Sequence, residues 1–229
     1  MERLLLSKFS PKVSHHKTPR KGSFVYTSAF GGVGVKYAHM GKSISHLFGS
    51  EAKVKIMRLF VFNKGSIFTA KTISERVQAS AKVVRKELAS LIKAGLVYKR
   101  ARGYVLNVEY DYLKAVERFL IEATPISEKE IIRKLSKAGS MRLILTSGVF
   151  KQDSEARVDL LVVGDKIKES TLLRAISSLE ADLGKELRFA AFETPDFKYR
   201  LGIYDKLVRD ILDYPHRKLV DKVGLQPKV

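Results

Sequence analysis

The sequence predicts an α+β protein with two folded domains: a small helical domain ending in a β-hairpin, then a small α/β domain with a mixed sheet. Apolar residues recur at helical spacing over most of residues 51–95. Two short β-rich runs, "LVYKR" and "GYVLN", follow them. Beyond residue 140, apolar strand-like runs surround one amphipathic helix. With 229 residues and 45% hydrophobic content, the chain can bury a core in each domain.

The formal net charge of +19 is the most unusual property of the chain. Residues 1–45 carry eight Lys and Arg against one acid, residues 46–124 carry fifteen against seven, and residues 125–229 carry twenty against sixteen. Such an excess suits a polyanion, either nucleic acid or an anionic membrane surface. No apolar run approaches the length of a membrane span, so we expect no membrane insertion. The front half therefore carries most of the polyanion signal.

The absence of cysteine excludes disulfides, thiolate catalysis and cysteine-type zinc sites. The histidines are scattered without metal-ligand spacing, so we predict no metal site. No secretory signal is visible, because the apolar part of "MERLLLSKFS" has only three consecutive leucines. These features predict a cytoplasmic protein.

Residues 1–45 show no lasting periodicity and are rich in Ser, Gly, Lys and His, which predicts a flexible basic arm. An organellar transit peptide is a second interpretation of this basic, acid-poor start. A third is that Met40 is the natural start and that the arm is an upstream extension.

Residues 46–109 form the predicted helical domain. "EAKVKIMRLFVF" reads as a helix closed near Gly65, and "TAKTISERVQ" as a short helix after the strand-like "SIF". Ser80 is the predicted N-cap of "AKVVRKELASLIKAG", which Gly95 ends. The apolar stripe of this helix consists of Val84, Leu88, Leu91 and Ile92. The two β-rich runs then form a hairpin whose basic turn ends at Gly103.

The order helix, short strand, helix, helix and basic hairpin is that of a winged helix-turn-helix. "TISERVQASAKVVRKELASLIKAGLVYKRARGYVL" resembles the DNA-reading core of ArsR/MarR-type winged-helix regulators. The resemblance implies that the third helix enters the major groove of double-stranded DNA and that the hairpin meets phosphates or the minor groove. The implied DNA-binding residues are Ser80, Lys82, Arg85 and Lys86 on the helix, and Lys99, Arg100 and Arg102 on the hairpin. The alternative is a solvated basic face.

Residues 110–124 read as an amphipathic helix, "YDYLKAVERFLIEA", with Tyr112, Val116, Phe119 and Leu120 on one side. In winged-helix dimers such a helix packs two subunits together, which predicts a homodimer. The alternative is a linker helix resting on its own domain. Thr124-Pro125 then breaks the chain, and we place the domain boundary there.

Residues 125–220 form the predicted α/β domain, followed by a tail at 221–229. Ser127 caps a first helix, "SMRLILTSGVF" and "RVDLLVVGD" are strands, and "KESTLLRAISSLEADLGKE" is the amphipathic helix. "LRFAAFET" is a third strand, and "PDFKYRLGIYDKLVRDILDYP" a single closing helix. In that last segment Tyr199, Arg200 and Tyr204 suggest RNA stacking. The helical spacing of apolar residues favours core packing instead, and these residues are Phe197, Leu201, Leu207 and Ile211.

This region resembles the minimal nucleotidyltransferase-type domains, carried on "LTSGVF", "VDLLVVGD" and the segment from "LEADLGKE" to the closing helix. Enzymes of that family hold the nucleotide phosphates with Gly-Ser after the first strand and Mg²⁺ with Asp-x-Asp on the second. Here the pair is inverted to Ser147-Gly148, and Arg157 stands where the first acid belongs. Asp159 survives, and the third strand has no acid before Glu193. The resemblance therefore implies a catalytically degenerate domain.

Three interpretations of Asp159 stay open. It forms a salt bridge with Arg157 or accepts buried hydrogen bonds; it belongs to a pocket in which Ser147, Gly148, Arg157 and Asp159 bind a nucleotide or other phosphorylated small molecule; or it still serves a transferase. We expect a sequence-specific DNA-binding transcriptional regulator, without cofactor, whose second domain acts in ligand sensing or assembly. The alternative is an active nucleotidyltransferase that uses Mg²⁺ and a nucleoside triphosphate to modify protein or RNA.

Overall fold

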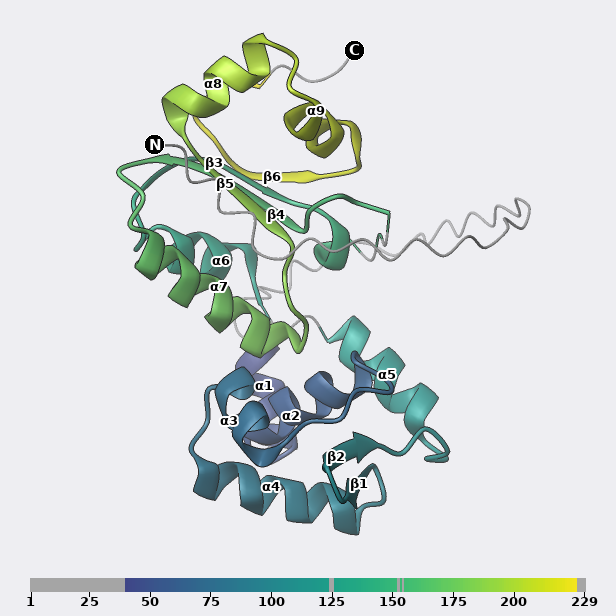
Figure 1. Ribbon diagram of the computed structural model, residues 1–229. Coiled ribbons are helices and arrows are strands. Elements are labelled where there is room, and N and C mark those ends of the chain that lie inside the picture. Colours follow the sequence, from purple (N-terminus) through teal and green to yellow (C-terminus); the bar gives the residue numbers. More distant parts are fainter. Residues whose placement is uncertain (1–39, 124–125, 152, 154, 226–229) are drawn as a thin grey trace, which may run out of the picture. The chain divides into compact units, whose positions relative to one another are not determined.

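The computed structural model describes residues 40–123, 126–151, 153 and 155–225 (Figure 1). Within these ranges the chain is an α+β protein with two small sheets, one of two strands and one of four. None of the described helices is long and apolar enough to cross a membrane. The predicted mixture of helix and sheet is therefore confirmed.

The first part of the described chain is mainly helical. Its helices are α1 (Met40–Leu47), α2 (Glu51–Val61), α3 (Ala70–Val77), α4 (Ala81–Lys93) and α5 (Leu113–Glu122), with the hairpin β1 (Val97–Arg100) and β2 (Gly103–Leu106) between the last two. Ser50, Thr69 and Ser80 cap α2, α3 and α4, each accepting the backbone N–H three residues ahead. One core includes Ile56, Phe60, Ile73, Val84, Leu88 and Leu120. Most of the predicted arm lies outside the described residues, but its end, from Met40, belongs to α1.

The hairpin is braced against the segment between α2 and α3. The backbone of Phe68 exchanges two hydrogen bonds with Tyr104, of 3.0 and 2.8 Å. The strand expected at "SIF" is thus a single bridge, because only this residue pairs. Gly103 has a φ of 143°, and a Cβ there would lie 2.5 Å from the carbonyl oxygen of Phe68. Only glycine allows this close approach at the end of the basic turn.

The second part contains the four-stranded sheet. Its elements are α6 (Glu128–Leu135), β3 (Ser140–Thr146), the short 3₁₀ helix η1 (Gly148–Phe150), β4 (Leu160–Asp165), α7 (Glu169–Leu183), β5 (Phe189–Glu193), α8 (Thr194–Gly202), α9 (Lys206–Asp213) and β6 (Arg217–Asp221). The strand order is β5-β4-β3-β6, with β4 and β5 parallel and the other pairs antiparallel. The sheet is mixed, as predicted.

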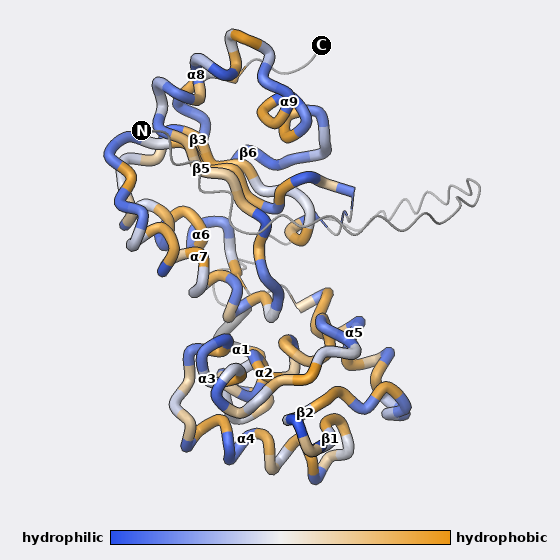
Figure 2. The backbone as a smooth tube through the Cα atoms, viewed as in Figure 1, coloured by the Kyte–Doolittle hydropathy of each residue, from blue (hydrophilic) through white to orange (hydrophobic). Residues whose placement is uncertain are grey.

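Both faces of this sheet are covered. Helices α6 and α7 lie on one face, and α8 and α9 on the other (Figure 1). Along β4, Leu160 and Val162 join the core under α6 and α7, whereas Leu161 and Val163 join the core under α8 and α9. Because successive strand residues point to opposite faces, a continuous apolar run is what such a strand needs. Most strands of this sheet accordingly appear hydrophobic in Figure 2, whereas much of β6 is hydrophilic.

The segment after β5 differs from the predicted single helix. It forms α8 and α9, separated at Tyr204, whose φ is 56°. Asp205 then caps α9 through the backbone N–H of Val208. The prediction of core packing is confirmed for Phe197 and Ile211, which are buried, but is wrong for Leu201, which is 37% exposed. Tyr199 and Tyr204 are exposed. Strand β6 was not predicted, because "RKLVD" is largely polar. It lies at the edge of the sheet and is mostly exposed.

Candidate nucleic-acid interface and the Asp159 cluster

Helix α4 presents a basic face to solvent. Val84, Leu88 and Leu91 are buried, whereas Lys82, Arg85 and Lys86 are exposed. Ser80 is also exposed, although its hydroxyl accepts the N–H of Val83 and is therefore committed to the cap. The buried and exposed faces predicted for this helix are therefore confirmed.

Lys93 belongs to the same face but was missing from the predicted residues. Lys82, Lys86 and Lys93 are four and seven residues apart, a spacing that aligns them along one side of a helix. All three are exposed, and no described acid forms an ion pair with them. The one acid within α4, Glu87, is buried and pairs with Lys53 of α2 at 3.3 Å. Glu87 therefore links α4 to α2 and does not neutralise the cations of the exposed face.

The hairpin turn adds further cations. Lys99 and Arg100 end β1, Arg102 follows in the turn, and all three side chains are exposed. The guanidinium of Arg100 lies 5.4 Å from the centre of the Tyr98 ring. The hairpin is closed at its base by Asn107, whose side chain donates to the carbonyl of Gly95 at 2.8 Å. The turn is therefore a charged loop on a rigid support.

Asp159 lies directly before β4 and is only 1% exposed. Its Oδ1 accepts the backbone N–H of Val149 at 2.9 Å and the Nη2 of Arg188 at 3.1 Å. Its Oδ2 accepts the backbone N–H of Arg188 at 2.8 Å and its Nε at 3.2 Å. Four donors thus occupy both carboxylate oxygens, and the predicted role as a buried acceptor is observed.

Arg157 does not pair with Asp159. The predicted strand "RVDLLVVGD" begins three residues late, at Leu160, so Arg157 precedes it. The half-exposed Arg157 guanidinium reaches Asp210 of α9 at 3.1 Å. Arg188, at the entry to β5, takes the place expected for Arg157 because β5 pairs in parallel with β4. The sequence alone does not predict this partner, because Arg188 is 29 residues from Asp159.

Ser147 and Gly148 complete the surroundings of Asp159. The Ser147 hydroxyl donates to the carbonyl of Pro215 at 2.7 Å, so it is engaged within the fold. Gly148 has a φ of 49°, and a Cβ there would lie 2.0 Å from Oδ1 of Asp159. The carboxylate therefore rests on the loop at the place where a phosphate-binding loop would receive its ligand.

These residues do not fit Mg²⁺ or a triphosphate. The oxygens of Asp159 already accept four hydrogen bonds, and its neighbours are a guanidinium and backbone N–H groups, which repel a cation. The N–H of Val149, which could bind a phosphate, is used by Asp159. Ser147, Gly148 and Asp159 lie close together, but the Ser147 hydroxyl binds Pro215 and the Asp159 carboxylate binds Val149 and Arg188.

Glu193, at the end of β5, accepts hydrogen bonds from a loop at the other end of β4. The carboxylate of Glu193 accepts the backbone N–H groups of Lys166 and Ile167, at 3.1 and 2.9 Å. It thereby ties the end of β5 to the loop between β4 and α7. Both acids thus hold loops that flank the same strand.

Comparison of this chain with models of protein families, with curated proteins and with solved structures finds no match. The site is therefore interpreted from its own geometry.

Proposed function

We propose that this protein is a sequence-specific transcriptional regulator that binds double-stranded DNA through residues 46–109, which act as a winged helix-turn-helix. The observation that carries the proposal is the exposed face of α4, where Lys82, Arg85, Lys86 and Lys93 have no ion pair with any described acid. Cations in a row without ion pairs repel one another and so destabilise a fold, but they can bind a polyanion.

The arrangement of α3, α4 and the hairpin supports this proposal. A sharp turn at Gln78, with a φ of 54°, separates α3 from α4, and the hairpin follows α4 directly. Helix α4, at thirteen residues, is about 20 Å long. A helix of this length can lie in the major groove, which is about 12 Å wide. Lys82, Arg85 and Lys86 in its first half would then approach base edges, and Lys93 a phosphate.

The hairpin has the features expected of a wing. Its turn carries Arg100 and Arg102, and the bridge between Phe68 and Tyr104 holds it against the helices. A rigid basic hairpin can place its charges on the phosphates beside the groove without losing much conformational entropy. Lys99 would contribute to the same backbone contact.

For the second part of the chain, the geometry supports assembly over ligand sensing. The Asp159 carboxylate takes the N–H of Val149 and lies against Gly148, so it competes with a phosphorylated ligand for this loop. We include a homodimer in the proposal, with α5 as its contact. Phe119 and Ile121 of this helix are partly exposed, at 37% and 40%.

The experiment compares binding of the full chain to labelled duplexes of differing sequence, measured by fluorescence anisotropy between about 50 and about 200 mM salt. The variant Lys82→Ala, Arg85→Ala, Lys86→Ala should lose its preference among duplexes. Alanine at Lys93, the residue expected to approach a phosphate, should make the plot of log affinity against log salt shallower by about 0.9. Changes at Lys99 and Arg102 should weaken all duplexes alike, because wing contacts carry no base information.

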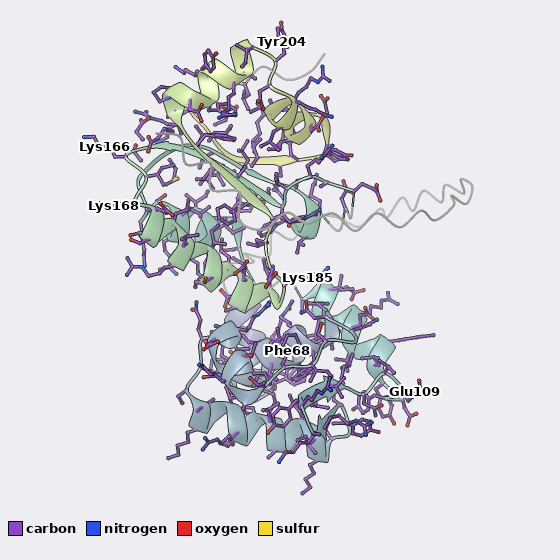
Figure 3. The ribbon with its side chains drawn as sticks, viewed as in Figure 1. Phe68, Glu109, Lys166, Lys168, Lys185 and Tyr204 are labelled. Carbon is purple, nitrogen blue, oxygen red and sulfur yellow. The ribbon has the colours of Figure 1, made fainter. Side chains whose placement is uncertain are left out.

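A matched control removes the same charge elsewhere. Lys129, Lys137 and Lys168 belong to the sheet-containing part, are exposed and form no ion pair with described residues. Figure 3 labels Lys168, which directly precedes α7. Replacement of these three lysines by alanine should leave sequence preference intact. Equal losses in the two triple variants would mean that total charge alone drives binding. Equal affinity of the parent chain for every duplex would overturn sequence-specific recognition.

A further inference from the structure

The corner between α8 and α9 carries a dense group of exposed apolar side chains. Tyr199, Leu201, Ile203 and Tyr204 are 66%, 37%, 55% and 80% exposed. Figure 3 shows Tyr204 at the outer end of this part of the fold, directed away from the sheet. Large apolar groups in such a cluster are unfavourable in water unless a partner covers them.

This corner is rigid and locally strained. Tyr204 has a φ of 56°, a left-handed conformation that bulky residues rarely adopt. Arg200 holds the corner from within: its Nε lies 3.0 Å from Asp196, its Nη1 lies 3.5 Å from Asp205, and its guanidinium lies 5.3 Å from the centre of the Phe192 ring. Strain kept at an exposed aromatic residue points to a use for that residue.

Helices α8 and α9, with Asp205 between them, carry equal numbers of acids and cations, but several of the cations are exposed. Asp196 and Asp205 are engaged by Arg200, and Asp210 is engaged by Arg157. The nearby cations Lys198, Lys206 and Arg209 are all exposed and have no ion pair with a described residue. The surface that a partner meets therefore combines two exposed tyrosine rings with exposed cations.

From these three features we propose that the α8–α9 corner binds single-stranded nucleic acid. Bases would stack on the rings of Tyr199 and Tyr204, and the cations would meet the phosphates. Stacking on an aromatic face does not depend on base identity, so this contact would be independent of sequence. The tyrosines are the most exposed members of the group, whereas a lipid-inserting corner would expose its aliphatic residues most. This inference is separate from duplex recognition by α4.

The test uses the full chain with alanine at Lys82, Arg85 and Lys86, so that duplex-binding charges do not mask the corner. Binding of short labelled oligo(dT) and oligo(U) is followed by anisotropy and by quenching of tyrosine fluorescence, which is observable because the chain has no tryptophan. Added to that background, Tyr204→Gly and Tyr199→Ala should each weaken binding by about 5-fold to about 100-fold. Glycine suits the left-handed backbone of residue 204, so loss of binding would not reflect misfolding.

Two further variants separate stacking from other effects. Tyr204→Phe keeps the ring and should bind as the parent does. Tyr112→Ala removes an equally exposed tyrosine, at 66%, from the helical part and should also leave binding unchanged.

Three results would overturn the proposal. The first is unchanged oligonucleotide binding in Tyr199→Ala and Tyr204→Gly. The second is that these variants lose sedimentation with vesicles of phosphatidylcholine and phosphatidylserine while oligonucleotide binding stays the same, which would assign the corner to a lipid surface. The third is that they change only the mass of the protein measured by light scattering, which would assign the corner to a second copy of the chain.

Discussion

Replacing Asp159 with Asn should destabilise the protein strongly, although the two side chains have nearly the same shape. The carboxylate accepts four hydrogen bonds, two on each oxygen, from Val149 and Arg188. An asparagine keeps one oxygen and presents an NH₂ group in place of the other. Whichever way the amide is turned, two donors lose their acceptor and face another donor.

The size of the effect follows from these contacts. Each lost hydrogen bond costs about 1 to 1.5 kcal/mol, and a buried donor without a partner adds to that cost. The Arg188 side chain is 45% exposed, so water can solvate its guanidinium and reduces the charge penalty. We therefore expect a loss of about 3 kcal/mol in the free energy of unfolding, below the upper range for breaking a fully buried ion pair.

Urea unfolding followed by circular dichroism measures this loss, with Arg157→Met as the comparison. The Arg157 pair with Asp210 is largely exposed on the arginine side, at 49%, so its loss should cost less than about 1 kcal/mol. If Asp159→Asn costs no more than Arg157→Met, the carboxylate does not hold the loop and our reasoning fails. If instead Asp159→Asn leaves stability unchanged and abolishes transfer of label from ATP with Mg²⁺, Asp159 is a catalytic group.

Three further changes test neighbouring contacts. Gly148→Ala should lower the melting temperature markedly, because the new Cβ would meet Asp159 at 2.0 Å and the φ of 49° is strained for alanine; an unchanged thermal melt would contradict this geometry. Lys53→Met leaves the buried Glu87 without its cation and should destabilise the protein by roughly 3 kcal/mol, measured by urea unfolding against Lys64→Met, whose partner is more exposed. Burial raises the pKa of Glu180 above its ordinary value of 4.5, so its ionised form weakens the fold as pH rises through that raised pKa. Glu180→Gln should therefore melt higher than the parent at neutral pH and lose this advantage below pH 4.5; an advantage that persists in acid would refute the assignment.

Much of the fold was predictable because its signals are local. The caps at Ser80 and Ser127, the helix breaks and the hairpin depend on residues close in sequence, and the structure has each of them. The orientation of α4 followed from one apolar stripe, so the exposure of Lys82 and Lys86 was predicted correctly. Lys93 was not among the predicted DNA-binding residues, because those lay in the first half of α4.

Some errors arose at a local turn, and others where distant segments decide the outcome. The single closing helix was wrong for a local reason: the chain turns at the left-handed Tyr204, Arg200 contacts Asp205 across the turn, and Asp205 caps a second helix. Leu201, whose helical spacing predicted core packing, is 37% exposed. Strand β6 forms because it pairs with the open edge of β3. Its own polar sequence does not predict a strand.

The sequence by itself determined the α+β class, the positive charge of the front half and the basic face of α4, because charge and periodicity are properties of neighbouring residues. Only the tertiary structure decided the partner of Asp159. Parallel pairing of β4 with β5 brings Arg188 to the carboxylate, while α9 draws Arg157 away. The fold decides which charges lie within reach of each other. Asp159 therefore pairs with Arg188, 29 positions away, and not with Arg157, two positions away.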